Sequence, residues 1–261
     1  MAEYKVVNAD ELDTGLTLIA NTIRKKLVNF NDKLSFPEEM VEAISMLGEA
    51  VADPPLPEGY TRLDYIQSSG TQYINTGVIA TTSVRSVIDL EWHIQPTDDG
   101  ILAAKAGNNR LYLLWRSSGS LGVGCGDYVS VGFTVSNNVR YVFETSLKAP
   151  KINLSCNNVN IFSRSSSASF NLGIPLYLFA NNADGTAGAF SKIRLYKCYL
   201  YQDENLVRYY VPCINTSGEV GLYDFVTETF FGNDGTGVFV AGQFATETDY
   251  QEALSELGVD V

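Results

Sequence analysis

The sequence contains no apolar run approaching the roughly 20 residues that a membrane-spanning helix needs. Its first residues also lack the basic-then-apolar pattern of a secretion signal. Charged residues make up only 18% of the chain, and no face rich in lysine and arginine emerges that could neutralise phosphates. We therefore expect a soluble chain that is not exported by that route, inserts into no membrane and binds no nucleic acid.

Histidine and cysteine are also scarce. His93 is the only histidine, which excludes most metal sites, and no GxSxG motif supplies a nucleophile for a catalytic triad. We read His93, beside Trp92, as a packed or rim residue. The four cysteines form no CxxC pair and are too sparse for a disulfide scaffold, so we expect buried free thiols, with one or two bridges as the alternative.

Acidic residues are abundant but unevenly distributed. Residues 1–57 hold ten acids and five bases, residues 243–261 hold five acids and no base, and residues 58–242 hold 15 acids and 13 bases. The middle of the chain is therefore nearly neutral. It is also rich in glycine and tyrosine, and this composition favours strands over helices.

Both ends of the chain have helical periodicity. Apolar residues recur at steps of three and four over 12–27, and a second amphipathic pattern over 35–47 begins with a capping box and a proline in its first turn. The sequence predicts a helical hairpin for attachment or oligomerisation within 1–52, a proline-rich linker at 53–59, and a short helix in the tail 243–261.

Between residues 60 and 242 the hydrophobic period changes to two. Alternating runs are separated by turn pairs such as Asn137-Asn138 and Asn157-Asn158, and no helical pattern interrupts them. The pattern predicts an antiparallel β-sandwich in place of a parallel βαβ fold. The run LGVGCG, 121–126, pairs an apolar face with bare glycines, which we attribute to a closely packed sheet or aromatic ring, with room for a ligand as the alternative.

Three segments carry a resemblance to a known family. YTRLDYIQSSGTQYINTGV, FANNADGTAGAFSKIRLYKCYLY and LVRYYVPCINTSGEVGLYDFVTETFFGNDGTGVF occur in the order found in concanavalin-A-like, laminin-G-like jelly-roll modules of bacteriophage and prophage structural proteins. The resemblance covers about residues 58–242. The segments LDTGLTLIANTIRKK and LSFPEEMVEAI are similar to short modules at the start of tail and baseplate-associated proteins of phages that infect Gram-positive bacteria.

This resemblance implies a virion component of the tail, fibre or head-fibre type, located on the phage particle surface and assembled in the host cytoplasm. The implied partners are other virion proteins, bound through the N-terminal helices, and a host cell-surface glycan. The chain is expected to form a homo-oligomer, with a trimer favoured. Two alternatives stay open: a purely architectural decoration or fibre protein without ligand binding, and a secreted bacterial surface lectin.

The first of the three segments, 60–78, predicts a strand, a turn at Ser68-Ser69-Gly70 and a second strand. Leu63, Tyr65, Tyr73 and Ile74 are expected to pack in the sandwich. We assign the segment the structural role of holding the two sheets together.

Jelly rolls of this type also include glycosidases of the laminarinase sort, which need two acids a few ångström apart. Asp89 and Glu91 lie near each other in sequence but lack a third acid at the required spacing, so we expect no enzyme and no cofactor. Laminin-G relatives sometimes bind calcium through acidic rim loops. The pair Asp98-Asp99 and the isolated Asp184 do not make a six-to-eight-oxygen cage, so we expect no metal.

Carbohydrate binding has simpler requirements. It needs an aromatic surface for the CH groups of a sugar, with hydrogen-bonding side chains around it. Each aromatic residue alone is read more readily as core, but one set of side chains together forms the predicted receptor site. The set consists of Tyr112, Trp115, Arg116, Tyr128, Asn181, Asn182 and Asp184.

Overall fold

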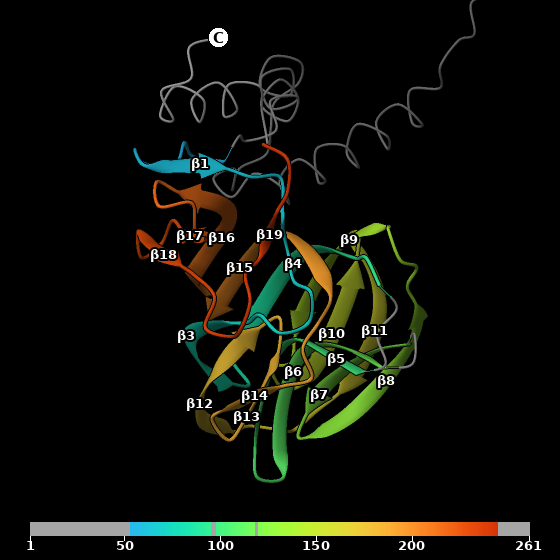
Figure 1. Ribbon diagram of the computed structural model, residues 1–261. Coiled ribbons are helices and arrows are strands. Elements are labelled where there is room, and N and C mark those ends of the chain that lie inside the picture. Colours follow the sequence, from blue (N-terminus) through green and yellow to red (C-terminus); the bar gives the residue numbers. More distant parts are fainter. Residues whose placement is uncertain (1–52, 95–97, 118–119, 245–261) are drawn as a thin grey trace, which may run out of the picture. The chain divides into compact units, whose positions relative to one another are not determined.

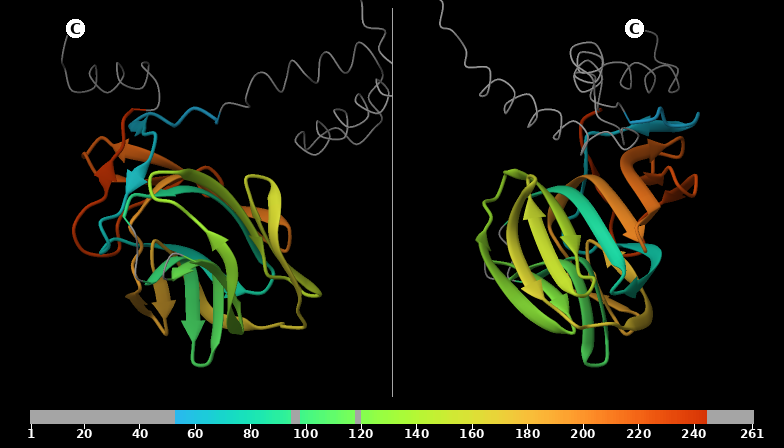
Figure 2. Two further views of the ribbon diagram at one scale, coloured as in Figure 1. Left: turned by 90° about the vertical axis from the view of Figure 1, so that its right-hand side faces the viewer. Right: turned by 180° about the vertical axis from the view of Figure 1, so that it is seen from behind.

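The computed structural model describes residues 53–94, 98–117 and 120–244. These residues form two β-sheets that pack face to face (Figures 1 and 2). Within them no helix is long and apolar enough to cross a membrane. The helices predicted within 1–52 and 243–261 lie outside the described residues, except for positions 243 and 244, so both helices stay predictions.

The large sheet has eleven strands in the described part of the chain. Its main path runs in the order β11-β10-β9-β4-β15-β16-β17-β18, with β1 beside β16 and with β2 joining β15 to β19. The strands are β1 (Tyr60–Arg62), β2 (Ile66–Gln67), β4 (Val84–Trp92), β9 (Arg140–Ser146), β10 (Lys151–Cys156), β11 (Val159–Ser165), β15 (Ile193–Gln202), β16 (Asn205–Asn215), β17 (Val220–Asp224), β18 (Thr229–Phe231) and β19 (Val240–Ala241).

The small sheet has eight strands in the described part. β12 lies between β3 and β5, and the path continues from β5 through β6 and β7 to β8, while the β13–β14 hairpin also pairs with β5. The strands are β3 (Ile74–Thr81), β5 (Asp98–Ala106), β6 (Asn109–Ser117), β7 (Ser120–Cys125), β8 (Asp127–Thr134), β12 (Asn171–Leu178), β13 (Asn181–Ala183) and β14 (Thr186–Gly188).

The pairing between named strands is antiparallel except for β13 on β5. This confirms the prediction of an antiparallel sandwich. Both predicted turns adopt the left-handed backbone that asparagine tolerates, with φ of 56° at Asn138 and of 48° and 65° at Asn157 and Asn158. Asn157 and Asn158 therefore close the hairpin between β10 and β11, as their sequence predicted.

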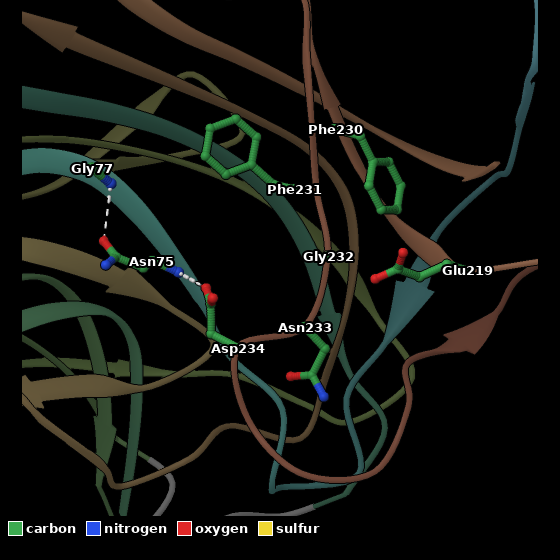
Figure 3. Close-up of a pocket in the computed structure, with 8 residues that line it drawn as sticks. All are labelled: Asn75, Gly77, Glu219, Phe230, Phe231, Gly232, Asn233 and Asp234. Carbon is green, nitrogen blue, oxygen red and sulfur yellow. Dashed lines mark hydrogen bonds between the residues drawn. The ribbon is translucent and has the colours of Figure 1, made fainter. Parts of the chain in front are cut away.

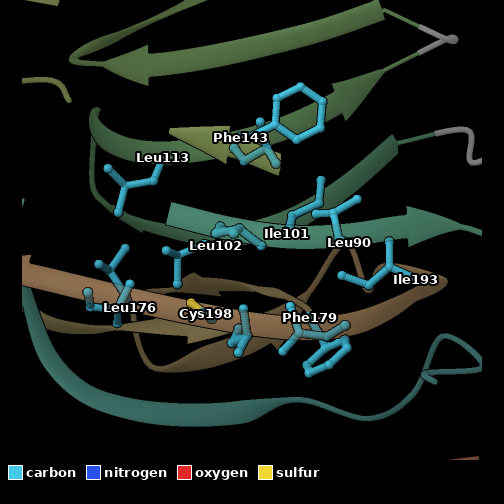
Figure 4. Close-up of a cluster of buried hydrophobic side chains, with 14 of the residues drawn as sticks. Leu90, Ile101, Leu102, Leu113, Phe143, Leu176, Phe179, Ile193 and Cys198 are labelled. Atoms are coloured by element: carbon cyan, nitrogen blue, oxygen red, sulfur yellow. The ribbon is translucent and has the colours of Figure 1, made fainter. Parts of the chain in front are cut away.

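The core lies between the two sheets, where alternate residues of each strand point inward. Leu90, Phe143 and Ile193 from the large sheet meet Leu102 and Leu113 from the small sheet (Figure 4). All five are fully buried. The four cysteines are also buried free thiols, as expected.

The segment 60–78 passes from the large sheet to the small one, since it contains β1, β2 and the start of β3. Gln72 fixes its turn: the amide oxygen accepts the Ser68 hydroxyl and the Ser69 backbone N–H at 3.0 and 2.9 Å. The amide nitrogen of Gln72 donates to the Val238 carbonyl at 2.9 Å. The buried Gln72 thus joins the turn to the closing part of the chain, which supports the structural role expected for this segment.

The core residues expected in this segment divide into two groups. Leu63 and Ile74 are buried in the core. Tyr65 and Tyr73 are only half-buried and lie outside it, and each ring packs against a tyrosine on the strand beside it, on β15 and β12 respectively. Aromatic pairs of this kind stabilise the outer face of a sheet.

Asp99 is an acid enclosed between the two sheets. Asp99 is 3% exposed, and it pairs in register with the fully buried Arg116, whose guanidinium lies 4.9 Å from the Trp92 ring centre. Burial raises the pKa of Asp99 to about 7, although the Lys192 backbone and the charge of Arg116 both lower it. Asp99 Oδ2 has no hydrogen-bond partner.

This buried carboxyl predicts an unusual pH dependence of stability. Because the folded pKa of Asp99 lies above its ordinary value of 3.8, the unfolded chain loses the proton first as pH rises. The contribution of Asp99 is therefore fully present below pH 4 and is lost between pH 4 and 7. We expect it to be on the order of 4 kcal/mol, since one pKa unit corresponds to about 1.4 kcal/mol.

Urea unfolding of the wild type and of Asp99→Asn at a series of pH values measures this contribution. The difference in free energy of unfolding between the two proteins should change steadily across pH 4–7, to the disadvantage of the wild type. A constant difference over that range would contradict the assignment.

Candidate functional site

A β-bulge in β6 determines which side chains reach the outer face of the small sheet. Tyr112 pairs with Gly124, and Trp115 pairs with Gly122, so two residues of β6 oppose the single Val123 of β7. The extra residue reverses the alternation beyond it. Tyr112 and Trp115, three positions apart, therefore share the outer face.

The neighbouring strands bring further residues into one row. Ala103, Tyr112, Gly124 and Tyr128 are successive partners across β5, β6, β7 and β8. Paired residues point to the same side of a sheet, so this row lies on the outer face. Ala103, Tyr112 and Trp115 form a small apolar cluster there, and Tyr128 and Ala189 pack against it; we call these five residues the outer aromatic cluster.

The glycines of LGVGCG explain how the rings fit. A Cβ atom on Gly122 would lie less than 3.0 Å from the Tyr128 ring, and one on Gly124 would lie 2.9 Å from the Tyr112 ring. The bare face of β7 is thus occupied by aromatic rings, which confirms the interpretation of close packing and fills the space that a ligand would have needed.

Contacts within the cluster hold the rings firmly. The Tyr112 and Trp115 rings are stacked, with centroids 4.4 Å apart and planes 21° from parallel. Trp115 Nε1 donates to Asp98 Oδ1 at 2.6 Å. Only 6% of Tyr112 and 7% of Trp115 are exposed, while Tyr128 is half-buried, so the cluster offers mainly ring edges to an incoming molecule.

The hydroxyl groups of the cluster stay protonated at neutral pH. Burial raises the pKa of Tyr112, the nearby Arg110 lowers it, and Asp98 raises it. Burial and Asp98 raise the pKa of Tyr128 as well. Both phenols therefore act as hydrogen-bond donors and acceptors.

Asn181 adds an unsatisfied polar group beside the cluster. It pairs with Ala103 in the parallel β13–β5 ladder, so its side chain belongs to the same outer face. Asn181 is 7% exposed, and its side-chain oxygen is buried with no hydrogen-bond partner. A buried acceptor without a donor costs about 1–3 kcal/mol, so its presence needs an explanation.

The backbone around Asn181 is strained. Phe179, two residues before it, has φ of 69°, and Ala189, which packs on the cluster, has φ of 46°. A bulky residue rarely adopts such a left-handed conformation, and strain of this kind concentrates at functional sites. The strained turn carries the chain from β12 into β13 and so places Asn181 next to Gly100, whose Cβ would meet Asn181 Cβ at 3.1 Å.

Three of the seven predicted site residues lie elsewhere. The bulge turns Arg116 into the interior, where it donates to the Val135 carbonyl at 3.2 Å. Asn182 is buried and bridges the Pro175 carbonyl and the Gly185 backbone N–H, both at 2.8 Å. Asp184 is exposed and accepts the Gly107 backbone N–H at 3.1 Å. The structure thus brings together Tyr112, Trp115, Tyr128 and Asn181 from the predicted set.

The other candidate residues have structural partners. Asp89 forms a two-pronged ion pair with Arg140 on the outer face of the large sheet, with both contacts at 2.8 Å. Glu91 accepts Arg194 at 2.7 Å and the Tyr196 hydroxyl at 3.1 Å. His93 Nε2 lies 2.9 Å from the Ser68 carbonyl oxygen, in keeping with the packed role expected for it.

Two contributors to this face were missed by the sequence interpretation. Asp98, considered only for calcium, instead holds the Trp115 indole. Arg110 lies with its guanidinium 5.8 Å from the Tyr112 ring centre. Its position two residues before Tyr112 on an alternating strand was the signal that could have identified it.

A second candidate is an open cavity of about 500 Å³ between the edge strands β3 and β18 (Figure 3). The side chains of Phe230 and Phe231 point away from each other in this view. The polar groups are bonded within the protein: Asp234 accepts the Asn75 backbone N–H at 2.7 Å, and Asn75 accepts that of Gly77 at 3.1 Å. This cavity therefore lacks the unsatisfied polar group found beside the outer aromatic cluster.

No family model matches this sequence, and no curated protein matches it. A protein of Bacteroides ovatus ATCC 8483, described as a candidate carbohydrate-binding protein, superposes with a TM-score of 0.53 at 10% identity. The match covers 71% of this chain and 61% of that protein, so this chain spans about three fifths of its length.

Two other solved structures superpose less closely. The CBM40 domain of the Ruminococcus gnavus IT-sialidase, bound to α2,3-sialyllactose, matches 55% of this chain and 91% of its own, with 11% identity and a TM-score of 0.44. The NanB sialidase of Streptococcus pneumoniae matches 56% of this chain and 27% of its own, with 15% identity and a TM-score of 0.39. At these identities the likeness concerns the fold alone.

The packing of Tyr128 on Gly122 gives a direct prediction. Gly122→Ala forces the Tyr128 ring out of its place, and we expect overpacking to lower the free energy of unfolding by about 1–3 kcal/mol. Gly188→Ala is the matched control, since a Cβ there meets nothing within 4 Å. Urea unfolding should show the loss for Gly122→Ala alone, and equal stabilities of the two variants would rule out the tight packing.

Proposed function

We propose that this β-sandwich binds carbohydrate, without cleaving it, on the outer face of the small sheet beside Asn181. The observation that carries the proposal is the buried Asn181 Oδ1, an acceptor without a donor next to the outer aromatic cluster. A sugar supplies what this oxygen lacks, because hydroxyl groups donate hydrogen bonds while the CH groups of the ring pack on aromatic side chains.

The arrangement fits the general chemistry of sugar recognition. Ring edges of Tyr112 and Trp115 provide apolar contact, and the phenol of Tyr128 and the carboxylate of Asp98 provide hydrogen-bonding groups around them. The described carbohydrate-binding character of the B. ovatus protein, which has a similar fold, agrees with this function.

Binding requires a local rearrangement. Asn181 Oδ1 makes no contact with solvent, so a sugar hydroxyl reaches it only when a covering side chain moves. Rotamer changes of this size are common on ligand binding.

The acids near the site support binding without cleavage. A glycosidase needs two carboxyl groups placed on either side of the scissile bond. Asp98 is engaged by the Trp115 indole, and Asp99 is enclosed in the sandwich. Asp89 and Glu91 are held in ion pairs on the large sheet, away from the proposed site.

The finer proposal follows from the sequence resemblance. We propose a concanavalin-A-like jelly roll on a phage virion protein that adheres to a host-surface glycan. The competing function is a purely architectural decoration or fibre protein. Retention of the purified chain on host cell-wall polysaccharide supports adhesion, whereas no retention, with copies of the chain associating through their sandwiches, supports architecture.

Asn181 and its neighbour provide a matched test of the proposed site. Asn181→Leu removes an amide that has no partner for its oxygen, so we expect the free energy of unfolding to change by no more than about 0.5 kcal/mol or to rise. Asn182→Leu removes a buried amide that makes two hydrogen bonds and should cost about 1–3 kcal/mol.

The affinity for a glycan should be affected in the opposite order to the stability, with the larger loss in Asn181→Leu. The full chain is first screened on a glycan array, and the dissociation constant for the best sugar is then measured by titration calorimetry. Asn181→Leu should weaken that affinity about five- to tenfold, which corresponds to one lost hydrogen bond. Unchanged affinity would remove Asn181 from the site, and no retained glycan would contradict the proposed function itself.

A further inference from the structure

Two positive charges lie opposite each other next to the outer aromatic cluster. Lys105 and Arg110 are direct partners across β5 and β6, and each lies two residues along its strand from the pair of Ala103 and Tyr112. Alternation along both strands places them on the same outer face. Like charges directly opposite each other destabilise a sheet, so the pair has a cost that a structural role does not explain.

Arg110 is built into the cluster and does not extend freely into solvent. Its Cγ atom packs over Gly124, where a Cβ would lie at 3.1 Å, alongside the Tyr112 ring. The guanidinium is 5.8 Å from the Tyr112 ring centre, and Arg110 Nε is buried without a hydrogen-bond partner. A guanidinium held in this way retains donors for an oxygen that the protein does not supply.

Among the described residues, no carboxylate forms an ion pair with Lys105 or Arg110. Arg85, Arg140, Arg194 and Arg208, all on the large sheet, form ion pairs with carboxylates. Lys105 and Arg110 take part in none of those pairs.

The acids nearest to Lys105 and Arg110 form no ion pair with either residue. Lys105 pairs with Ala183, and the next residue, Asp184, accepts the Gly107 backbone N–H with its carboxylate. Asp98 holds the Trp115 indole at the other end of the cluster. Lys105 and Arg110 thus lie at one end of the cluster, with Asp184 nearby, and Asp98 lies at the other end.

We propose that the glycan bound at this site is anionic, with its negative group held by Arg110 and Lys105 while a sugar ring lies against Tyr112. This inference rests on the proposed carbohydrate-binding function and names its ligand class. A guanidinium matches a carboxylate, phosphate or sulfate with two parallel hydrogen bonds, and the neighbouring ammonium adds a point charge. Because the acidic group is held at the Lys105 and Arg110 end of the cluster, the direction in which the glycan lies is also set.

The test uses pairs of glycans that differ only in the acidic group, displayed on one array and bound by the full chain. The pairs are uronate oligosaccharides with their methyl esters, sulfated with unsulfated oligosaccharides, and phosphorylated with unphosphorylated ones. We expect the anionic member of at least one pair to bind tenfold or more tightly than its neutral partner, since charge-assisted bonds exceed neutral ones. The pair that discriminates identifies which anion is recognised.

Variants assign the preference to the two residues. Arg110→Gln should reduce the affinity for the anionic glycan about tenfold and leave that for the neutral partner unchanged. Lys105→Gln, at a half-buried position, should act in the same direction with a smaller effect and provides the test if Arg110→Gln does not fold. Arg164→Gln and Lys151→Gln, at exposed positions of the large sheet, are the matched controls and should change neither affinity.

The outcomes separate this inference from the function on which it rests. Equal binding of charged and neutral partners, unchanged in Arg110→Gln and Lys105→Gln, overturns the anionic ligand and leaves carbohydrate binding standing. An equal loss of anion affinity in the two control variants also overturns it, because the effect is then one of overall charge. Binding of no glycan of any kind contradicts the proposed function.

Discussion

The candidate site depends on one irregularity, the β-bulge that sets Leu113 and Leu114 against Val123. A strand turns successive side chains to opposite faces, so a single extra residue exchanges the faces of everything beyond it. Without the bulge, Trp115 would point into the core and Arg116 outward beside Tyr112. With it, the stacked pair of Tyr112 and Trp115 forms on the outer face, and a guanidinium is enclosed in the sandwich.

The small sheet adjusts to this exchange in two ways. Glycines at 122 and 124 leave the space that the Tyr128 and Tyr112 rings occupy, and the strained turn at Phe179 places Asn181 against the same face. The interior receives Arg116, which lies over the Trp92 ring and pairs in register with the buried Asp99. Three of the buried polar atoms without partners, Asn181 Oδ1, Asp99 Oδ2 and Arg110 Nε, belong to residues on strands that meet at this irregular region, while others, such as Ser86 Oγ and Thr145 Oγ1, lie on the large sheet.

Much of the fold follows from local rules of sequence. The period of two, the asparagine turns at 137–138 and 157–158 and the absence of helical patterns predicted an antiparallel sandwich, which the structure confirms. The site was predicted only in part, because a bulge follows from how three strands pair and not from the pattern of one. Asn181, Asn182 and Asp184 looked alike in sequence, yet tertiary hydrogen bonds engage the second and third and leave the first unsatisfied.

The central claim is that the unpaired oxygen of Asn181 is completed by a sugar. A crystal structure of the full chain with its best-binding oligosaccharide tests this most directly. The account predicts a sugar hydroxyl within hydrogen-bonding distance of Asn181 Oδ1, about 2.5–3.0 Å, and a sugar ring against Tyr112 and Trp115. An oligosaccharide bound elsewhere, with the Asn181 oxygen still unpaired, would contradict the account.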